Sequence, residues 1–344
     1  MQDSAVLSEL DLTVINCLQL HPRATWRQVG DVLEIDAVTV ARRWRRLSET
    51  GAAWVIGRPA AHQSPESCLA VVEVHCVSGG ALETARLLAH WPHVLSVEHT
   101  SGNYDLQLVV AVANMASLSR FLLEGLGGVA GIRATRTHVV TQMFRQGDQW
   151  ELNMLDAAQR ARLPAAEERH PARAHVLDDT DRQLILCLGE DGRQSLSELS
   201  ARLGLSLSTT RRRLDALIAQ EDLILRCDAA QSLSGWPIAM WLWARVDADD
   251  QHTITSLPRK IPGLRVCLSV TGSESNLVLA LAARSMREVP LVEARLAAAA
   301  PRLRVLNQTM VLRSLKRMGR ILDDAGRSVA SVPMDIWAEP GGVR

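Results

Sequence analysis

The sequence of 344 residues lacks several features that would each indicate a class of protein. It has no uninterrupted apolar run of roughly 18 residues, the length that a membrane-spanning helix needs. The N-terminal stretch MQDSAVLSELD lacks the basic and apolar regions of a secretory signal peptide. We therefore expect a cytoplasmic protein that makes no contact with a membrane.

Cysteine pairs are also missing. The six cysteines are scattered and form no CxxC pair, which disfavours a zinc site or a disulfide framework and favours reduced, mostly buried thiols. His90 and His93 flank Pro92, which is expected to end a helix between them, so solvated or capping histidines are favoured over a metal site. Nothing resembles a phosphate-binding loop, a nucleophile elbow or a paired-carboxylate site. We predict neither a metal nor a cofactor.

The chain carries no excess of charge of either sign. Lys and Arg together number 38, as do Asp and Glu, and the only lysines are Lys260 and Lys316. A net charge of zero predicts no polyanionic partner for the chain as a whole. Any surface that binds nucleic acid must therefore be local and built from arginine.

One long unit occurs twice in the chain, at an offset of 170 residues, as in Asp11 and Asp181. Identical residues at this offset also include Ile15 and Ile185, Cys17 and Cys187, Arg23 and Arg193, Thr39 and Thr209, and Arg42 and Arg212. The offset still holds far downstream, where SG at 101–102 meets TG at 271–272. This pattern predicts two tandem copies of one unit, not a solenoid of short repeats.

The first part of each unit has the pattern of three short helices. Apolar residues recur at helical spacing in LDLTVINCLQL and in DTDRQLILCLGE. Capping residues for the second and third helices stand at equivalent positions: Thr25 with Gln28, and Asp36, in the first copy; Ser195 with Glu198, and Ser206, in the second. Three short helices with a tight turn before the third predict a helix-turn-helix unit.

The later part of each unit mixes strands with helices. CLAVVEVHCV and IAMWLWARVD alternate as strands do, and VLSVEHTSGNYDLQLVVAV reads as two strands around a glycine turn. With the helical stretches between them the order is β-α-β-β-α-β, that of the ferredoxin-like fold. The predicted fold class is α+β: two winged helix-turn-helix units, each followed by a ferredoxin-like βαββαβ effector module.

These patterns divide the chain into alternating domains. The boundaries are residues 1–60 for helix-turn-helix unit 1, 66–145 for effector module 1, 146–177 for a linker, 178–228 for helix-turn-helix unit 2, 236–316 for effector module 2 and 317–344 for a C-terminal tail. The linker is polar, alanine-rich and broken by prolines, so we expect at most one short helix in it.

The third helix of each unit is predicted to carry a basic face. In the first copy Val40, Trp44 and Leu47 have the spacing of a buried face. Residues directed outward are Val38, Thr39, Arg42, Arg43, Arg45 and Arg46 in the first copy, and Ser208, Thr209, Arg211 and Arg212 in the second. Arginines neutralise phosphates or make bidentate contacts to guanine, and short hydroxyl side chains reach base edges. A solvated charged face is the alternative, but its recurrence on a capped third helix favours double-stranded DNA as a partner.

At these residues the chain resembles the Lrp/AsnC (feast/famine) transcriptional regulators. IDAVTVARRWRRLSETGAAWV and LSLSTTRRRLDALIAQEDLI resemble the family's recognition helix and following turn. TSGNYDLQLVV and VTGSESNLVLAL resemble its strand–glycine turn–strand signature. The resemblance covers nearly the whole chain, twice, in the tandem form of the long actinobacterial members. It implies a regulator whose modules associate with one another, so that a fused chain forms its pseudo-dimer internally.

The resemblance also implies an amino-acid effector near the glycine turn. In the first copy the turn comprises Ser101, Gly102, Asn103, Tyr104 and Asp105. Gly102 would allow close backbone approach, and Asp105 would pair with a ligand ammonium. The second copy offers Thr271, Gly272 and Asn276 and lacks the Tyr–Asp pair, so it binds either no ligand or a different one. A plain hairpin turn is the alternative for both.

Two further alternatives stay open. Trp241 and Trp243 share a strand face with Arg245 and form either a ligand wall or an interface between sheets. Siroheme decarboxylases share this fold and also occur as tandem chains, so fold alone does not exclude an enzyme. Their signature is a His-Asn-Tyr stretch, whereas Asn103–Tyr104 here follows a glycine. We therefore predict a regulator and not an enzyme.

Overall fold

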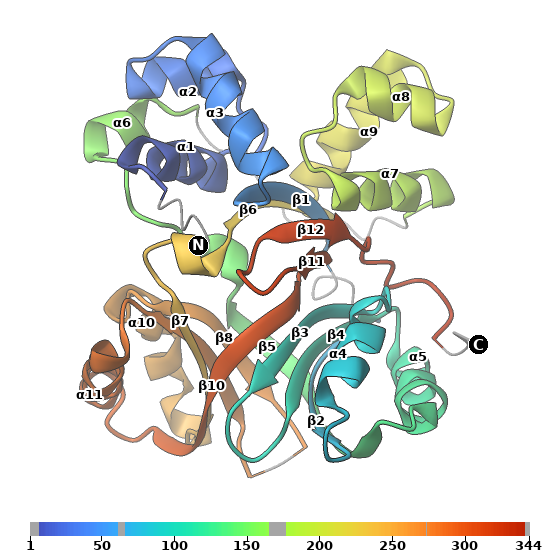
Figure 1. Ribbon diagram of the computed structural model, residues 1–344, viewed down its shortest axis with the longest axis vertical. Coiled ribbons are helices and arrows are strands. Elements are labelled where there is room, and N and C mark those ends of the chain that lie inside the picture. The colour runs from blue at the N-terminus through green and yellow to red at the C-terminus, as the bar shows by residue number, and fades with distance from the viewer. Residues whose placement is uncertain (1–6, 61–65, 165–176, 273, 341–344) are drawn as a thin grey trace.

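The computed structural model describes residues 7–60, 66–164, 177–272 and 274–340. Parts of four predicted segments lie outside the described residues: the start of helix-turn-helix unit 1, residues 165–176 of the linker, residue 273 of effector module 2 and the last residues of the tail. Two helical units stand on the same side of a closed β-barrel, which is flanked by further helices (Figure 1).

The helical units have the predicted three-helix outline. The bounds are α1 Glu9–Leu20, α2 Trp26–Leu33 and α3 Ala37–Glu49 in unit 1, and α7 Asp179–Glu190, α8 Leu196–Leu203 and α9 Leu207–Ala219 in unit 2. The predicted caps are confirmed: Thr25 and Ser195 form capping boxes, and Asp36 Oδ1 accepts the Thr39 N–H at 2.8 Å. The turn before each third helix begins with a left-handed residue, Glu34 (φ +57°) or Gly204 (φ +65°), which ends the second helix sharply.

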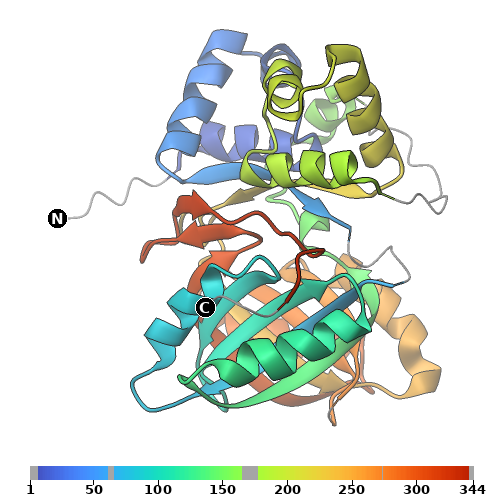
Figure 2. The ribbon, with the colours of Figure 1, turned by 90° about the vertical axis from the view of Figure 1, so that its right-hand side faces the viewer.

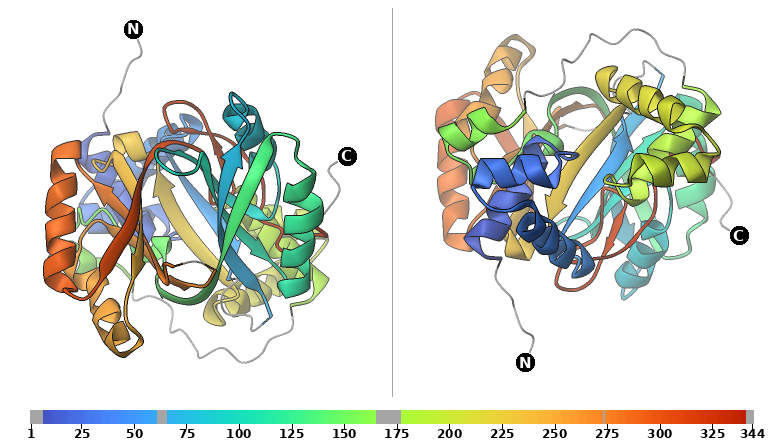
Figure 3. Two further views of the ribbon diagram at one scale, coloured as in Figure 1. Left: turned by 90° about the horizontal axis from the view of Figure 1, so that it is seen from below. Right: turned by 90° about the horizontal axis from the view of Figure 1, so that it is seen from above.

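One strand follows each third helix, and the two strands pair with each other. β1 (Ala53–Pro59) runs antiparallel to β6 (Leu223–Ala229), with Ile56 opposite Arg226 at the centre. The two units therefore share a single wing ribbon, which passes between them and the barrel (Figures 1 and 3).

Each module has the predicted βαββαβ order. Module 1 comprises β2 Cys68–Cys76, α4 Ala81–Ala89, β3 Val94–Thr100, β4 Leu106–Val112, α5 Met115–Arg120 and β5 Ile132–Arg145. Module 2 comprises β7 Ile238–Arg245, α10 Gln251–Lys260, β8 Leu264–Val270, β9 Leu277–Ala283, α11 Val289–Ala299 and β10 Arg304–Arg317. The strand orders, β3–β4–β2–β5 and β8–β9–β7–β10, are equivalent.

The long last strand of each module closes the barrel. The first part of β5 pairs with β2, and its end pairs with β8 of the other module, Val140 opposite Val270. β10 likewise pairs first with β7 and then with β3, Val311 opposite Thr100. Figure 3 shows the resulting barrel end-on, with the helices of the two modules on opposite sides. The chain is thus a pseudo-dimer of its own two modules.

Both faces of the sheets are buried. Ala70, Val72 and Val74 on β2 pack under the helices of module 1, as their alternation predicts. Val71, from the other face of the same strand, packs inside the barrel against Trp243. Trp241 and Trp243 therefore lie in the interface between the sheets, one of the two alternatives for this pair.

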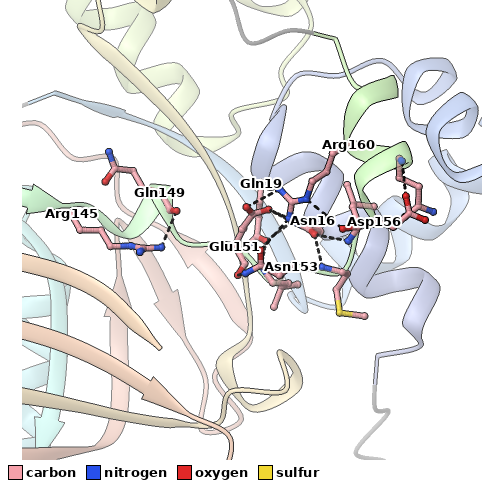
Figure 4. Close-up of polar contacts among 12 residues, drawn as sticks. Asn16, Gln19, Arg145, Gln149, Glu151, Asn153, Asp156 and Arg160 are labelled. Carbon is pink, nitrogen blue, oxygen red and sulfur yellow. Dashed lines mark hydrogen bonds and ion pairs between the residues drawn. The ribbon is translucent and has the colours of Figure 1, made fainter. Parts of the chain in front are cut away.

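Segments that follow the two modules bind the helical units. After β5, Leu152 and Met154 donate backbone N–H groups to Gln19 Oε1 and Asn16 Oδ1 of α1, at 2.9 and 2.7 Å. Figure 4 shows this docked segment, including Glu151 with its bidentate partner Arg160 on α6 (Ala157–Arg162). After β10, the hairpin β11 (Arg320–Leu322) and β12 (Ser328–Ser331) leads to a tail that packs on unit 2. The first half of the predicted linker is thus an ordered strap between module 1 and unit 1.

A buried lysine offers a test of the packing. Lys316 on β10 is 0% exposed, and its Nζ donates to the Trp91 carbonyl at 2.8 Å. Burial lowers its pKa to about 7. Below pH 7 both folded and unfolded states hold the proton and the burial penalty is complete. Between the folded pKa and the unfolded one the unfolded state binds more protons, so stability rises with pH. We expect Lys316→Met to stabilise the fold by about 2 kcal/mol at pH 6.5 and to gain little at pH 10.

Urea denaturation of both proteins at several pH values measures this effect. The exposed Lys260, the other lysine of the chain, provides the matched control, and Lys260→Met should change neither the stability nor its pH slope. An identical pH slope in wild type and Lys316→Met would contradict the assignment.

Candidate nucleic-acid interface and effector turns

The helices that would face DNA lie on the outer side of the molecule. In Figures 1 and 2 the second helices α2 and α8 stand farther from the barrel than α1 and α7, and each third helix runs from that outer level down toward the wing ribbon. Val38 at the start of α3 is 77% exposed. Arg42 and Arg45 on α3 and Arg211 and Arg212 on α9 are exposed and make no ion pair with another described residue. These side chains are available to an external partner.

The other predicted DNA-facing residues are partly engaged within their units. Ser208 is exposed, whereas Thr39 and Thr209 are half-buried. Their hydroxyls bond the N-cap residues, Thr39 to Asp36 Oδ2 at 2.6 Å and Thr209 to Ser206 Oγ at 2.9 Å. These threonines therefore begin their helices and present only part of their surface outward.

Arg43 makes an internal contact that the sequence analysis missed. Its Nη1 lies 3.0 Å from Oδ1 of Asp11, which is buried on α1. Arg46 reaches the other carboxylate oxygen at 2.7 Å, although its own side chain is 59% exposed. Burial alone would raise the pKa of Asp11, but bonds from Ser8 and Arg43 outweigh that effect and lower it. Arg43 thus ties the third helix to the first.

Unit 2 repeats this tie. Arg213 Nη1 lies 2.6 Å from Oδ1 of the buried Asp181. Asp181 and Arg213 are the counterparts of Asp11 and Arg43 at the offset of 170 residues. Since both partners recur at the same spacing, the repeat itself carried a signal for the pair.

A second pair of repeated arginines fixes one helical unit against the other. Arg23, between α1 and α2, donates to the carbonyls of Gly192 and Gln194 at 2.7 and 2.8 Å. Arg193, its counterpart in unit 2, donates to those of Pro22 and Ala24 at 2.5 and 2.8 Å. Its guanidinium also lies 3.9 Å from the ring centroid of Trp26. Burial lowers the pKa of both arginines, and that of Arg193 to about 10, so Arg193 stays cationic at neutral pH. With the wing ribbon, these reciprocal contacts hold the units in one relative orientation.

The first glycine turn is bonded to the opposite module. Ser101 exchanges two hydrogen bonds with Met310 of β10, at 2.9 and 3.0 Å. Gly102 has φ +99°, and an added Cβ would lie 3.2 Å from Thr309 Cγ2, so glycine is needed there. Gly102 and Asn103 are exposed.

Tyr104 and Asp105 of this turn point elsewhere. Tyr104 is buried in the barrel, donates to Gln107 Oε1 at 2.5 Å and accepts from Trp243 Nε1 at 3.0 Å. Burial raises its pKa to about 12. Asp105 Oδ2 accepts the Cys76 N–H at 2.7 Å. The structure therefore does not gather the predicted effector residues into one pocket, and their role stays a prediction.

The second turn repeats this construction with other residues. Thr271 donates its N–H to Val139 of β5 at 2.9 Å, and Gly272 (φ +105°) packs on Thr137. Asn276 Oδ1 accepts the Val246 N–H at 2.9 Å. Asn276 and Asp105 therefore hold the same position at the end of the first strand of their modules.

Other predicted or excluded sites are placed as follows. His90 Nδ1 bonds the Arg86 carbonyl at 2.9 Å, and His93 Nε2 bonds the Ala338 carbonyl at 2.8 Å. The six cysteines are free and buried, as predicted, and burial raises the pKa of Cys17 and Cys267 to about 12.

In the described ranges no cluster of His, Cys, Asp or Glu side chains could hold a metal ion. No helix there is both long and apolar enough to cross a membrane.

Known proteins match both kinds of domain. The model of the AsnC-type helix-turn-helix domain matches residues 7–48 and 177–218, and that of the Lrp/AsnC ligand binding domain matches residues 69–150. The HTH-type transcriptional regulator FL11 of Pyrococcus horikoshii is 30% identical over 144 residues, which cover 41% of this chain and 93% of that protein. The HTH-type transcriptional regulator Ptr1 of Methanocaldococcus jannaschii is 24% identical over 146 residues, which cover 41% of this chain and 97% of that protein.

Solved structures of the siroheme decarboxylase NirDL match nearly the whole chain. The complex with an iron-uroporphyrin III analogue has a TM-score of 0.58 over 90% of this chain and 93% of that one. The identity is 14%, so the likeness concerns the fold alone.

Paired helix-turn-helix units with exposed basic third helices, set on two ferredoxin-like modules, define a DNA-binding transcriptional regulator. The chain belongs to the Lrp/AsnC family. It carries two of the family's helix-turn-helix units in one polypeptide.

Proposed function

We propose that the two units of one chain read the two halves of a single DNA operator. The residues that would make contact are Val38, Thr39, Arg42, Arg45 and Arg46 on α3 and Ser208, Thr209, Arg211 and Arg212 on α9. The observation that carries the proposal is that two exposed basic helix faces are held in one relative orientation by the wing ribbon and by Arg23 and Arg193. Arg43 and Arg46 both pair with Asp11, but Arg46 stays among the proposed contacts because its side chain is 59% exposed, whereas that of Arg43 is 29% exposed.

The two halves should not be equivalent. Arg45 and Arg46 of α3 correspond at the repeat offset to Asp215 and Ala216 of α9. The first helix is therefore the more basic one and should make more phosphate contacts. The preferred operator should be an imperfect palindrome with half-sites about 10 base pairs apart or a multiple of that.

Selection of bound sequences from random duplex DNA, followed by footprinting, tests this function. We expect two protected half-sites with different base preferences. A perfectly symmetric site, or protection of one half only, would contradict two working units. Failure to enrich any sequence would contradict the regulator itself.

A small-molecule effector completes the proposed function. The first module, which the ligand-binding model matches, would take an amino acid at the turn of residues 101–105, with the ammonium at Asp105. The corresponding site of Thr271, Gly272 and Asn276 lacks a carboxylate at the equivalent position, so we propose that ligand binding at the turns is confined to module 1.

The effector modules would also join chains to one another. Several large apolar side chains on their helical outer faces are exposed: Leu82, Leu87, Met115, Leu123, Met286 and Leu291. Apolar side chains on an outer face favour association. We propose a cytoplasmic regulator that assembles through these faces and has no enzymatic activity. Against a decarboxylase, the Asn103–Tyr104 pair is split, because Tyr104 is buried and already bonded within the barrel.

A further inference from the structure

The mouth of the barrel beneath the wing ribbon encloses a cavity of about 170 Å³. Its walls come from strands of both modules, from both ribbon strands, and from the strap that follows β5. An apolar cavity of about 150 Å³ can hold a benzene-sized molecule. The space therefore suits a small organic molecule.

Two arginines on the wall form ion pairs with aspartates that also lie on the wall. Arg58 of β1 lies 3.0 Å from Asp148 Oδ1, and Arg226 of β6 lies 2.5 Å from Asp228 Oδ1. All four side chains are at most 16% exposed. The Arg58–Asp148 pair joins the ribbon to the strap, whereas the Arg226–Asp228 pair lies within β6. Neither pair adds net charge to the wall.

Two more arginines on the wall have no acidic partner among the described residues. Arg265 of β8 makes no hydrogen bond there: its guanidinium lies 4.1 Å from the ring centroid of Trp150, and its buried Nε is unpartnered. Arg317 donates only to neutral oxygens, those of Gln231 and Ser314. The one other acid on the wall, Glu98, accepts from Trp241 Nε1 at 2.6 Å.

The electrostatics of Arg265 agree with this geometry. Burial, together with repulsion by Arg317, lowers the pKa of Arg265 to about 9. A buried cation without a hydrogen-bonded anion is costly unless a ligand supplies one. A guanidinium with free N–H groups binds a carboxylate in bidentate fashion.

Much of the rest of the wall is apolar. Leu95, Val109, Met240, Trp241 and Leu268 from four strands line the same space. Such walls with a few convergent polar groups are the general form of a small-molecule site. Trp241 lines this cavity as well as the interface between the sheets.

We propose that this cavity binds a small carboxylic acid with an apolar body, its carboxylate held by Arg265 and Arg317 and its body by the barrel interior. Glu98 adds a place for an α-amino group, so a simple acid and an apolar amino acid share the required chemistry. The site is distinct from both glycine turns.

The cavity also touches the DNA-binding part of the molecule. Trp150, which stacks on Arg265, lies in the strap, and Leu152 two residues later donates to Gln19 of α1 at 2.9 Å. Gln19 and the neighbouring strap residues are drawn in Figure 4. A bound acid would therefore shift the position of unit 1. That consequence rests on the proposed function, whereas the binding itself does not.

Calorimetry on the full chain without DNA tests the site. The probes are 4-methylpentanoate and phenylacetate, their uncharged amides, and L-leucine and L-phenylalanine. We expect at least one of the acids or amino acids to bind. The amide of a simple acid should bind at least tenfold more weakly than the acid itself. Arg265→Met should lower the affinity for the bound acid at least tenfold. The amides test the charge requirement even if that variant folds poorly, and Arg265→Gln provides a second variant.

The matched control is Arg284→Met. Arg284 also stacks on a tryptophan, 5.0 Å from the Trp236 ring centroid, but does not line the cavity, so binding should be unchanged. If a simple acid binds and the corresponding amino acid does not, Glu98 does not accept an ammonium group. If the amino acid alone binds, Glu98 does accept one. Both results support the site if Arg265 is required. No binding at millimolar concentration, or binding lost in Asp105→Asn and kept in Arg265→Met, would overturn it. Loss of DNA binding would leave this result untouched.

Discussion

The variant Arg42→Ala Arg212→Ala should lose most of its affinity for the selected operator while remaining folded. Each side chain is exposed at an equivalent place on its third helix and has no ion pair to lose. Loss of one arginine contact to a base costs about 1–3 kcal/mol. The sites belong to different units, so the costs should nearly add, to about 2–6 kcal/mol, or roughly 30-fold or more in Kd. Fluorescence anisotropy with the operator duplex at several salt concentrations measures this.

The single variants refine the test. Each should relax base preference in one half-site only, because each acts through one unit. Arg295→Ala removes an exposed arginine from α11 of module 2 and should bind like wild type. Wild-type affinity of the double variant over the whole salt series would show that the third helices do not read DNA.

Arg43→Ala should differ in effect from Arg42→Ala, because Arg43 is ion-paired with Asp11 and Arg42 makes no ion pair with a described residue. This contrast marks a limit of prediction from sequence. Helical periodicity placed both on the outward face. It was right about the buried face, where Val40 and Leu47 are at most 1% exposed. Helical periodicity could not predict the position of Asp11, which lies on another helix and forms an ion pair with Arg43. Periodicity describes one helix, whereas a pair across two helices depends on how they pack.

The fold itself was largely predictable from local signals. Capping boxes and strand alternation act over a few residues, so they survive in any tertiary context. The shared wing ribbon and the closed barrel were harder to predict. They pair Ile56 with Arg226 and Val140 with Val270, and each pairing joins strands far apart in sequence. The family resemblance implied a pseudo-dimer but not which strands would pair across the two modules.

The effector turn shows the same limit at a site. Gly102 was interpreted as allowing close backbone approach to a ligand, and its φ of +99° also favours glycine. Asp105 was interpreted as a ligand for ammonium, yet one of its oxygens accepts from Cys76. Asn276 makes the equivalent bond to Val246, so a clamp at the end of the first strand is needed whether or not the residue is charged. The cavity at the barrel mouth combines residues from both modules and could not be read from either repeat alone.

The variant Arg23→Ala Arg193→Ala should weaken the preference of the protein for half-site spacing. In the wild type, inserting 5 base pairs between the half-sites rotates the second half-site to the other face of the duplex. Because the two units are held together, one of them must then release its half-site, and we expect affinity to fall at least a hundredfold. The double variant removes the reciprocal bonds to the carbonyls of residues 22, 24, 192 and 194. It leaves the wing ribbon, the Gly192 N–H bond to the Val55 carbonyl, and the docked strap and tail. A two-stranded ribbon by itself is only marginally stable, so the penalty for the insertion should shrink at least tenfold.

Competition binding with operators of native and extended spacing measures this difference directly. The matched control is Arg202→Ala, which breaks an ion pair with Glu190 inside unit 2 and should leave the spacing penalty unchanged. The affinity of the double variant for an isolated half-site should equal that of wild type, because neither arginine is on a third helix. If the full spacing penalty persists in the double variant, the wing ribbon and the docked strap and tail alone set the orientation of the two units.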